Sequence, residues 1–544
     1  MQIVKPDAIT TTGSVTRTGT ATYYDSNGVL QTTSNGALRF GYNPDSLEFT
    51  GLIVENSSTN TIVQSSLFSD ASWTNSNVSY TTGLTSPAGT STATKVIPTT
   101  NNSTHYIRTT AVALPNVSTK YTASVFVKAS GYSIVRVALG SDFYFFNLST
   151  GNVGIKSSDS TPVVEKLTNG FYRLGISTTA TSTSAILLVV NICIQEAIVL
   201  YQGDGTSGII FYGAQCEASP IMTSYIATSG AAASRSAEVI TGSGLLYTNV
   251  TNPYSEWSSG TTYSLGQTVV VGTYTGSNTV TVANSGTYKS LTNSNLNNNP
   301  LTSPTNWVRL GPTNQFAMFD NVVSSVTSGT SDITFVIKST SVDSVAVLNA
   351  VASKVSCAVA DYSYSGSYLG NVVYYRTEQL SGSEALDWYS YFFFDEETQK
   401  TQALYLSIPK VSDGIITVKI TGSGTVSAGS IIAGQIKEIG QTQYGVNTGI
   451  IDYSRKETDE FGNTSLVVRN YSKRMNAKVF LTNNNLNRVQ RLLYSIRATP
   501  VLWIGSSDPT FEEPLVVMGY YKDFDTEIAY PAHSLCNITV DGLI

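Results

Sequence analysis

The residues of this sequence that could do chemistry are aromatic rings set among hydroxyl and amide side chains. Between residues 61 and 240 the candidates are Trp73, Tyr106, Tyr132 and Tyr144. The apolar face of a sugar ring lies well on an aromatic ring, and nearby amides and hydroxyls can bond its rim. The same rings could instead fill the core of a domain. These residues therefore predict either carbohydrate stacking or core packing.

A second aromatic group lies between residues 241 and 312. Its members are Trp257, Tyr263, Tyr288 and Trp307. A domain this small needs aromatic side chains merely to have a core. Trp257 and Trp307 could therefore be either core residues or platforms for a sugar.

Residues that commonly carry catalysis form no motif here. Asp395, Glu396 and Glu397 are consecutive, so they would point to alternate faces of a strand, whereas a glycosidase pair must face across one bond. The sequence has no GxSxG elbow, no HExxH motif and no GxxxxGK[ST] phosphate loop. Carboxylates far apart in the sequence could still meet in the fold. We nevertheless expect a protein that is not an enzyme and needs no cofactor.

Metal and disulfide chemistry are also not indicated. The chain has two histidines, and Asp204 lacks the alternating acidic neighbours of a calcium loop, so a turn is expected there and no metal site. The cysteines are scattered and form no CxxC pair. Buried free thiols are predicted, with a Cys193–Cys216 bridge as the alternative.

The composition excludes several classes of partner. Of the 544 residues 12% are charged, and 31 basic against 37 acidic residues give a net charge of −6, which argues against nucleic-acid binding. With 41% hydrophobic residues the chain can bury real cores. No run approaches 18 apolar residues, and the N-terminus has no basic segment followed by an apolar one. We therefore expect neither membrane insertion nor a secretory signal.

Residues 61–240 are predicted to form a β-sandwich of jelly-roll type. The segment 121–128 alternates between apolar and polar residues, and in 133–139 Ile134, Arg136 and Ala138 lie opposite Val135, Val137 and Leu139. Short strands separated by polar turns are typical of sandwiches. The small residues of 227–237 are expected to form an extended exit from this domain.

The rest of the chain predicts further modules. In 313–440, alternation at 333–337, valines in 342–359 and an aromatic run at 387–394 predict strands of a second, galactose-binding-like sandwich, with the aromatic run buried. Apolar residues at helical spacing predict a helix over 485–498, capped by Asn484 or Asn485 and stopped by Pro500. Strands flank this helix. The fold class is therefore mainly β and multidomain, with parts 1–60, 61–240, 241–312, 313–440 and a C-terminal α+β domain, 441–544.

Three parts of the sequence resemble known families. The strings ATYYDSNGVLQ, RFGYNPDSLEFTGLIVENSSTN and GDGTSGIIFYGAQCEAS, within residues 16–240, resemble bacteriophage tail and head-fibre appendage proteins, which implies a carbohydrate-binding-module-like sandwich. The string DYSRKETDEFGNTSLVVRNYSKRMNAKVFL resembles the C-terminal block of phage tail-associated structural proteins. That resemblance implies an attachment or assembly role for 441–544.

The third resemblance is that of residues 241–312 to small chitin- or cellulose-binding modules. It implies a small β fold whose exposed aromatic rings stack on polysaccharide, with Tyr288 the most exposed of them. The inserted hairpin 273–284 departs from the family pattern.

Together these features predict a virion structural protein of a tailed phage. It would lie on the tail as a homo-oligomer, contact other tail proteins and bind host-surface glycan. The candidate binding residues are Trp73, Tyr132, Trp257, Tyr263, Tyr288 and Trp307. One alternative is a tailspike depolymerase, although the sequence lacks the short repeats of a β-solenoid. The other is a purely structural spacer.

Overall fold

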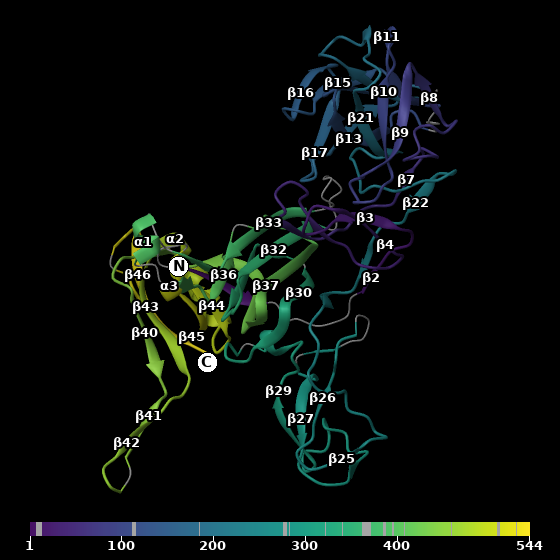
Figure 1. Cartoon of the computed structure of the whole chain (residues 1–544). Helices are drawn as coiled ribbons and strands as arrows, with labels where there is room; N and C mark the ends of the chain where they lie inside the picture. The colour runs from purple at the N-terminus through teal and green to yellow at the C-terminus, as the bar shows by residue number, and fades with distance from the viewer. Residues whose placement is uncertain are drawn as a thin grey trace. The chain divides into compact units, whose positions relative to one another are not determined.

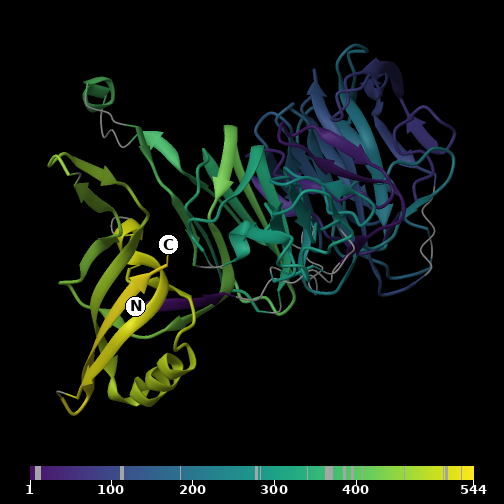
Figure 2. The same ribbon diagram turned by 90° about the horizontal axis from the view of Figure 1, so that it is seen from below.

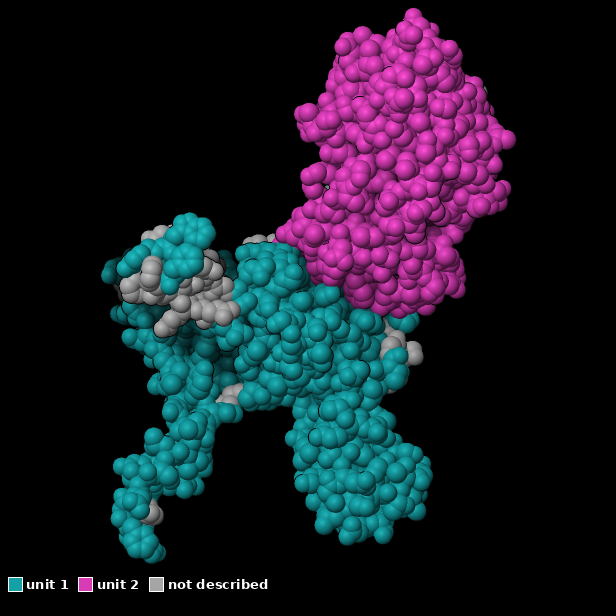
Figure 3. All heavy atoms as spheres, viewed as in Figure 1, with its two compact units in different colours: residues 1–14, 241–357, 376–544 teal, residues 15–240, 358–375 magenta. Residues whose placement is uncertain are grey.

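The fold is mainly β, as expected. A computed structural model describes residues 1–544 except 7–13, 111–115, 184, 276–279, 282, 321, 340, 362–371, 384–387, 394–396, 407, 459, 507, 509–511, 529 and 544. It holds 55% strand and 4% helix. Two compact units are distinguished in Figure 3. Unit 1 comprises Met1–Ser14, Thr241–Cys357 and Arg376–Ile544, and unit 2 comprises Val15–Ile240 and Ala358–Tyr375.

Unit 2 contains a sandwich of two antiparallel six-stranded sheets. The first sheet runs in the order β17 (Thr161–Lys166), β18 (Tyr172–Thr179), β13 (Lys120–Ser130), β21 (Gly208–Glu217), β10 (Ala93–Pro98) and β9 (Val78–Leu84). The second sheet runs in the order β16 (Asn152–Lys156), β15 (Asp142–Asn147), β14 (Ile134–Leu139), β19 (Leu188–Cys193), β12 (Tyr106–Thr109) and β8 (Trp73–Ser76).

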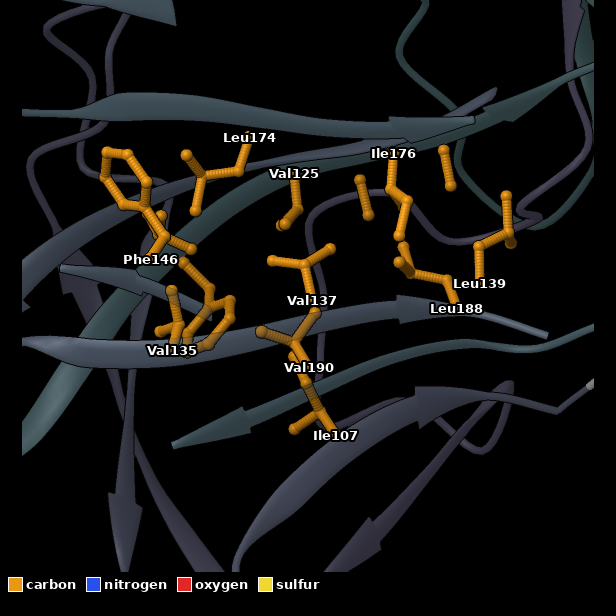
Figure 4. Close-up of a cluster of buried hydrophobic side chains, with 14 of the residues drawn as sticks. Ile107, Val125, Val135, Val137, Leu139, Phe146, Leu174, Ile176, Leu188 and Val190 are labelled. Atoms are coloured by element: carbon orange, nitrogen blue, oxygen red, sulfur yellow. The ribbon is translucent and has the colours of Figure 1, made fainter. Parts of the chain in front are cut away.

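The core of the sandwich lies between these two sheets. Figure 4 shows Val125, Leu174 and Ile176 from the first sheet facing residues of the second. Val135, Val137 and Leu139 are fully buried there, which confirms the predicted alternation along β14. Since successive side chains of a strand point to opposite faces, Arg136 must lie on the outer face of the second sheet.

The outer face of the first sheet is covered by the chain's own flanking segments. Tyr225 packs edge-on against Phe126 of β13, with ring centroids 5.9 Å apart, and Leu30 joins the same apolar cluster. The Tyr24 hydroxyl donates to Glu165 Oε2 at 2.9 Å. Residues 15–60 therefore belong to the same unit as 61–240.

The segment predicted as an extended exit also returns to unit 2. Within it, β22 (Ala233–Arg235) pairs with β7 (Ser58–Asn60). Arg235 is fully buried, and its Nη1 lies 2.8 Å from Glu55 Oε2. The small residues of 227–237 thus allow close approach to the domain. The other short pairs of unit 2 and its boundary are β2 (Ser14–Thr16) with β23 (Val239–Thr241), β3 (Ala21–Tyr24) with β4 (Leu30–Thr33), β5 (Phe40–Tyr42) with β6 (Phe49–Leu52), and β11 (Asn102–Thr104) with β20 (Leu200–Gln202).

Unit 1 is built on a ten-stranded sheet. The sheet gathers segments from both ends of the sequence, because β1 lies between β38 and β44. Its order is β36 (Gln402–Tyr405), β31 (Ser344–Leu348), β38 (Ser430–Glu438), β1 (Gln2–Pro6), β44 (Val501–Ile504), β45 (Val516–Glu527), β46 (His533–Gly542), β43 (Tyr471–Thr482) and β39 (Gln441–Thr442), with β40 (Asn447–Asp452) also paired to β43. The short α3 (Glu512–Leu515) precedes β45. Figure 1 shows the hairpin of β41 (Arg455–Thr458) and β42 (Thr464–Val467) projecting beyond β40 and β43.

One face of this sheet is covered by α2 (Asn483–Ser495), which confirms the predicted helix (Figure 2). Val489, Leu493 and Ile496 are buried against the sheet. The N-cap position is Thr482 and not Asn484 or Asn485, and the Thr482 side chain makes no capping hydrogen bond. The helix also ends before Pro500.

The strands of 313–440 are divided between two sheets. β31, β36 and β38 belong to the ten-stranded sheet, so this region shares a sheet with 441–544. Four others join β24 (Gly244–Thr248) in a five-stranded sheet with the order β24, β30 (Thr327–Ser339), β37 (Gly414–Ala428), β32 (Lys354–Asp361) and β33 (Val372–Gln379). A 3-10 turn, η1 (Ala317–Phe319), precedes β30, and β34 (Ser381–Ser383) pairs with β35 (Glu397–Gln399) in a separate two-stranded sheet.

The prediction of a buried strand at 387–394 is wrong. Trp388–Phe393 form the short helix α1, and the Trp388 side chain is 78% exposed. A continuous aromatic run has no period that separates strand from helix, and this one lies at the surface. Asp395 and Glu396 lie outside the described residues.

Residues 251–312 form the small module. Its three-stranded sheet has the order β26 (Thr268–Val271), β27 (Gly286–Ser290) and β29 (Trp307–Gly311), beside the pair β25 (Thr262–Tyr263) and β28 (Asn295–Leu296). Part of the hairpin 273–284 lies outside the described residues.

The two ends of the longer segment of unit 2 meet at one place in unit 1. The Ser14 and Thr241 hydroxyl oxygens are 3.0 Å apart, although 226 residues lie between these two positions. None of the described helices has the length and apolarity that a bilayer crossing requires.

Candidate functional site

The strongest candidate site is the outer face of the second sheet of the sandwich. Tyr106, Arg108, Arg136, Phe143 and Asn191 lie on it, and we call these five residues the arginine face. Their neighbours in sequence, such as Ile107 and Val137, point into the core. Strand alternation therefore places every member of the group on the side away from the core.

Strand register brings residues of the arginine face into two cross-strand rows. In the first row Tyr106 of β12 lies opposite Asn191 of β19, and Asn191 lies opposite Arg136 of β14. In the second row Arg108 lies opposite Val189, which lies opposite Ala138, which in turn lies opposite Phe143. Side chains directly opposite each other in antiparallel strands are in contact range. The register thus forms one surface from three separate parts of the sequence.

Both arginines of this face are held against aromatic rings. The Arg136 guanidinium carbon lies 4.4 Å from the Phe143 ring centroid, and that of Arg108 lies 5.8 Å from the Tyr106 centroid. Such cation–π contacts favour one orientation of the side chain. Arg136 Nη1 also donates to Asn191 Oδ1 at 3.3 Å. The arrangement leaves the remaining N–H groups of Arg136 available to a ligand.

The charge of this face is not neutralised locally. Within the part of the chain that the structure describes, no carboxylate lies within 4.0 Å of the Arg108 or Arg136 guanidinium. Partial burial lowers the pKa of Arg136 from its usual value. An arginine nevertheless stays protonated in proteins. An anionic group of a ligand could therefore pair with either guanidinium.

A loop borders one end of the arginine face. Val199 packs on Ile134, Phe145 and Cys193, which lie on the same side of the sheet. The loop's Glu196 accepts a hydrogen bond from the Ile155 amide through Oε2 at 3.1 Å. This carboxylate is therefore bonded to the backbone of β16.

The aromatic residues predicted to bind within unit 2 do not form this face. Trp73 is 4% exposed, belongs to the sandwich core and donates from Nε1 to Gln64 O at 2.8 Å. Tyr144 is completely buried. Tyr132 is half-buried, packs on the core and lies 5.7 Å from the Tyr201 ring centroid. Of the four rings considered in this domain, only Tyr106 belongs to the arginine face.

In the small module the candidate aromatic rings form its core. Tyr263, Tyr288 and Trp307 are 7%, 6% and 2% exposed, and Trp257 is partly buried against them. The expectation that Tyr288 is the most exposed ring is therefore wrong. Trp307 Nε1 donates to Asn298 O at 2.9 Å, and its ring lies 5.3 Å from that of Tyr263. A module this small buries its aromatics because it has few other apolar side chains.

Sequence reasoning missed Arg108, Phe143 and Asn191. The alternation of residues 133–139 already placed Arg136 outside the core. The same rule, applied to the strand that contains Tyr106, would have predicted that Arg108 lies on the same face as Tyr106. The strand order was not visible, and only that order makes Asn191 a neighbour of both Tyr106 and Arg136.

The cysteines and Asp204 have structural roles. All four cysteines are free and buried, as predicted. Asp204 Oδ1 accepts from the amides of Thr206 and Ser207 at 2.8 and 2.7 Å, which makes the expected turn. Among the residues that the structure describes, no group of three or more His, Cys, Asp or Glu side chains could hold a metal ion.

Comparison with known proteins yields distant structural likenesses only. No family model matches the chain, and no curated protein is similar to it in sequence. One similar structure is the CBM22-1–GH10 part of xylanase 10B from Clostridium thermocellum, solved with xylohexaose (15% identity, 29% of this chain and 27% of that chain, TM-score 0.18). Another is the CBM22-1 xylan-binding domain of Xyn10C from Paenibacillus barcinonensis (10%, 29% and 90%, TM-score 0.18). The tandem CBM51 modules of a family 98 glycoside hydrolase from Streptococcus pneumoniae also match (9%, 77% and 100%, TM-score 0.14).

The chain thus spans about a quarter of the xylanase chain that it matches. At these TM-scores the likenesses identify neither a ligand nor a binding face.

Proposed function

We propose that this chain is a non-catalytic glycan-binding protein and that the arginine face is its binding surface. The observation that carries the proposal is the alignment of two ring-stacked, carboxylate-free guanidiniums with an amide across neighbouring strands. The chain's own segments cover the outer face of the other sheet. A ligand of the sandwich therefore has the arginine face available.

The chemistry of the face fits a glycan that carries acidic groups. Exposed parts of Tyr106 and Phe143 offer apolar area to a sugar ring, and the buried Asn191 helps to orient Arg136. Guanidinium groups bind carboxylate or sulfate through paired N–H donors. The geometry thus supports capture of a uronate- or sulfate-bearing polysaccharide over capture of a neutral one.

We further propose display on the tail of a bacteriophage, with several copies in one particle. The sequence strings between residues 16 and 240, and the string that starts at Asp452, support this part of the proposal. A weak site repeated on one particle gains avidity, by a factor of about 10² to 10⁴ when the geometry permits simultaneous binding. Residues 441–544 would then attach the chain to other tail proteins.

Binding of the full-length chain to a panel of acidic and neutral polysaccharides tests the function. We expect retention on an acidic polysaccharide that weakens as salt rises, because exposed charge pairs are screened. Arg136→Gln and Arg108→Gln should each weaken it about tenfold. Lys166→Met is the matched control, since Lys166 of the same unit is exposed and paired with Asp45.

Three outcomes would contradict the proposal. Equal binding by all variants would remove the arginine face from the site. Release of reducing ends would favour the depolymerase. An intact wild-type chain that binds no polysaccharide of the panel and no host cell would leave only a spacer role.

A further inference from the structure

A second concave site lies in unit 1, at the end of the ten-stranded sheet where β43 and β45 begin and β46 ends. Along β45, Val516 and Met518 belong to one apolar cluster, whereas Val517 between them belongs to the cluster that contains α2. Alternate residues of a strand occupy opposite faces. A cavity of about 420 Å³ is lined by Val516, Met518 and Leu348 of that first cluster. The floor of the cavity is therefore apolar.

The charged side chains that line this cavity are cations. Lys473 and Arg469 line it, and no acidic residue is among the described residues that do. Lys473 Nζ donates to the backbone carbonyl of Glu513 at 2.9 Å. Within the described chain, neither Lys473 nor Arg469 has a carboxylate within 4.0 Å. Both cations thus keep capacity for an anion.

An unpartnered buried amide is the independent sign of a ligand here. Gln402 also lines the cavity, its side chain is 7% exposed, and its Nε2 has no hydrogen-bond partner among the described residues. A buried donor without a partner costs about 1–3 kcal/mol. Gln402 lies on β36, opposite Leu348 of the cavity floor. A ligand acceptor in the cavity would remove that cost.

The charged groups near Lys473 do not cancel the preference of the cavity for an anion. Burial lowers the pKa of Lys473, and the nearby Glu513 partly opposes that change. The Glu513 carboxylate accepts from Thr401 Oγ1 at 3.2 Å, so it is oriented by a neighbour on the rim. A partly desolvated ammonium gains more from an anionic ligand than an exposed one does.

We propose that this cavity binds an organic carboxylate whose apolar body lies on Leu348, Val516 and Met518. Its carboxylate accepts hydrogen bonds from Lys473, Arg469 and the Gln402 amide. The cavity volume falls within the range of about 300–1,000 Å³ that small-molecule sites occupy. The site belongs to unit 1 and does not depend on the proposed glycan function of unit 2.

The test measures the binding of 4-phenylbutyrate and of its uncharged analogue 4-phenylbutan-1-ol to the full-length chain. Titration calorimetry should show the carboxylate binding at least tenfold more tightly than the alcohol, because only the carboxylate forms charge-assisted bonds. Lys473→Met should weaken the carboxylate about tenfold and leave the alcohol unchanged. Lys437→Met is the control, since Lys437 is exposed and does not line the cavity.

Two further variants separate a ligand site from a packing defect. Gln402→Met removes the unpartnered donor, so it should raise the melting temperature of the free protein and weaken the carboxylate severalfold. Glu513→Gln removes the nearest competing charge and should strengthen the binding of 4-phenylbutyrate. The proposal is overturned if 4-phenylbutyrate does not bind, if the alcohol binds equally, or if Lys473→Met or Gln402→Met binds the carboxylate like wild type.

Discussion

Replacing Arg39 by methionine should lower the stability of unit 2, because Arg39 joins its N-terminal segment to the rest of the unit. The Arg39 side chain is completely buried, and its Nη2 lies 2.9 Å from Glu55 Oε2 and pairs also with Glu238. Its Nη1 donates to Thr22 O at 2.9 Å and to Ser224 Oγ at 2.8 Å. One guanidinium thus joins residues 22–55 to residues 224–238. Methionine fills similar space but satisfies none of these acceptors.

The expected cost is about 3 kcal/mol of unfolding free energy. Removing one partner of a buried ion pair costs about 3–5 kcal/mol, because the remaining charge is left buried. Here each carboxylate keeps a second guanidinium. Glu55 Oε2 lies 2.8 Å from Arg235 Nη1, and Glu238 Oε1 lies 3.2 Å from Arg17 Nε. The loss should therefore fall at the lower end of that range.

Calorimetry of the full-length chain measures this change. A loss of about 3 kcal/mol should lower the melting temperature of unit 2 by about 6–12 °C, since about 1 kcal/mol corresponds to about 2–4 °C in a domain of this size. Hydrogen exchange in β13 and β18 assigns the transition to unit 2. Lys166→Met is the control, because its ion pair with Asp45 is exposed and contributes less than about 1 kcal/mol. If Arg39→Met melts with the control, the buried network does not hold the unit together.

Three other predictions follow from groups already described. Burial raises the pKa of Glu55, but Arg235, Arg39 and hydrogen bonds from Ser224 outweigh it and hold that pKa at about 2. Because this carboxylate ionises more readily in the folded state, unit 2 should lose stability as pH falls from about 4 towards 2. Acid unfolding of Glu55→Gln should therefore depend less on pH over that interval. Trp307→Ala should cost the small module about 3–5 kcal/mol of unfolding free energy and abolish hydrogen-exchange protection in β26, β27 and β29. A variant that stays folded and loses only glycan retention would contradict a core role for Trp307. Burial raises the pKa of the Cys193 thiol to about 12 and raises that of Cys357 as well. Iodoacetamide at pH 8 should therefore label neither thiol in the native chain and both in denaturant, as measured by mass spectrometry. Rapid labelling of the native chain would show that these thiols are accessible.

Local periodicity was sufficient to predict strands β13 and β14 of the sandwich and the helix α2. Val135, Val137 and Leu139 alternate with outward residues, and Val489, Leu493 and Ile496 recur at helical spacing. Each pattern is carried by residues close in sequence, so no knowledge of the fold was required.

Features that depend on distant partners could not be predicted in this way. The pairing of Val4 with Ile436 and Leu502 joins segments more than 400 residues apart, and nothing in either segment specifies the other. The arginine face has the same property, because Asn191 reaches Arg136 only through the strand order. Burial of Arg39 is equally hidden, since arginine side chains are mostly exposed and its buried partner Glu238 lies far away in the sequence.

The closeness of Ser14 and Thr241 makes residues 15–240, the larger part of unit 2, an insertion with adjacent ends. Their hydroxyls are 3.0 Å apart, so a linker of a few residues could replace everything between them. Because β1 is already held between β38 and β44, the shortened chain would keep its ten-stranded sheet. A different sandwich with adjacent ends could be placed at the same junction. Recombination could thus exchange the sandwich that carries the proposed binding face without changing the ten-stranded sheet of unit 1.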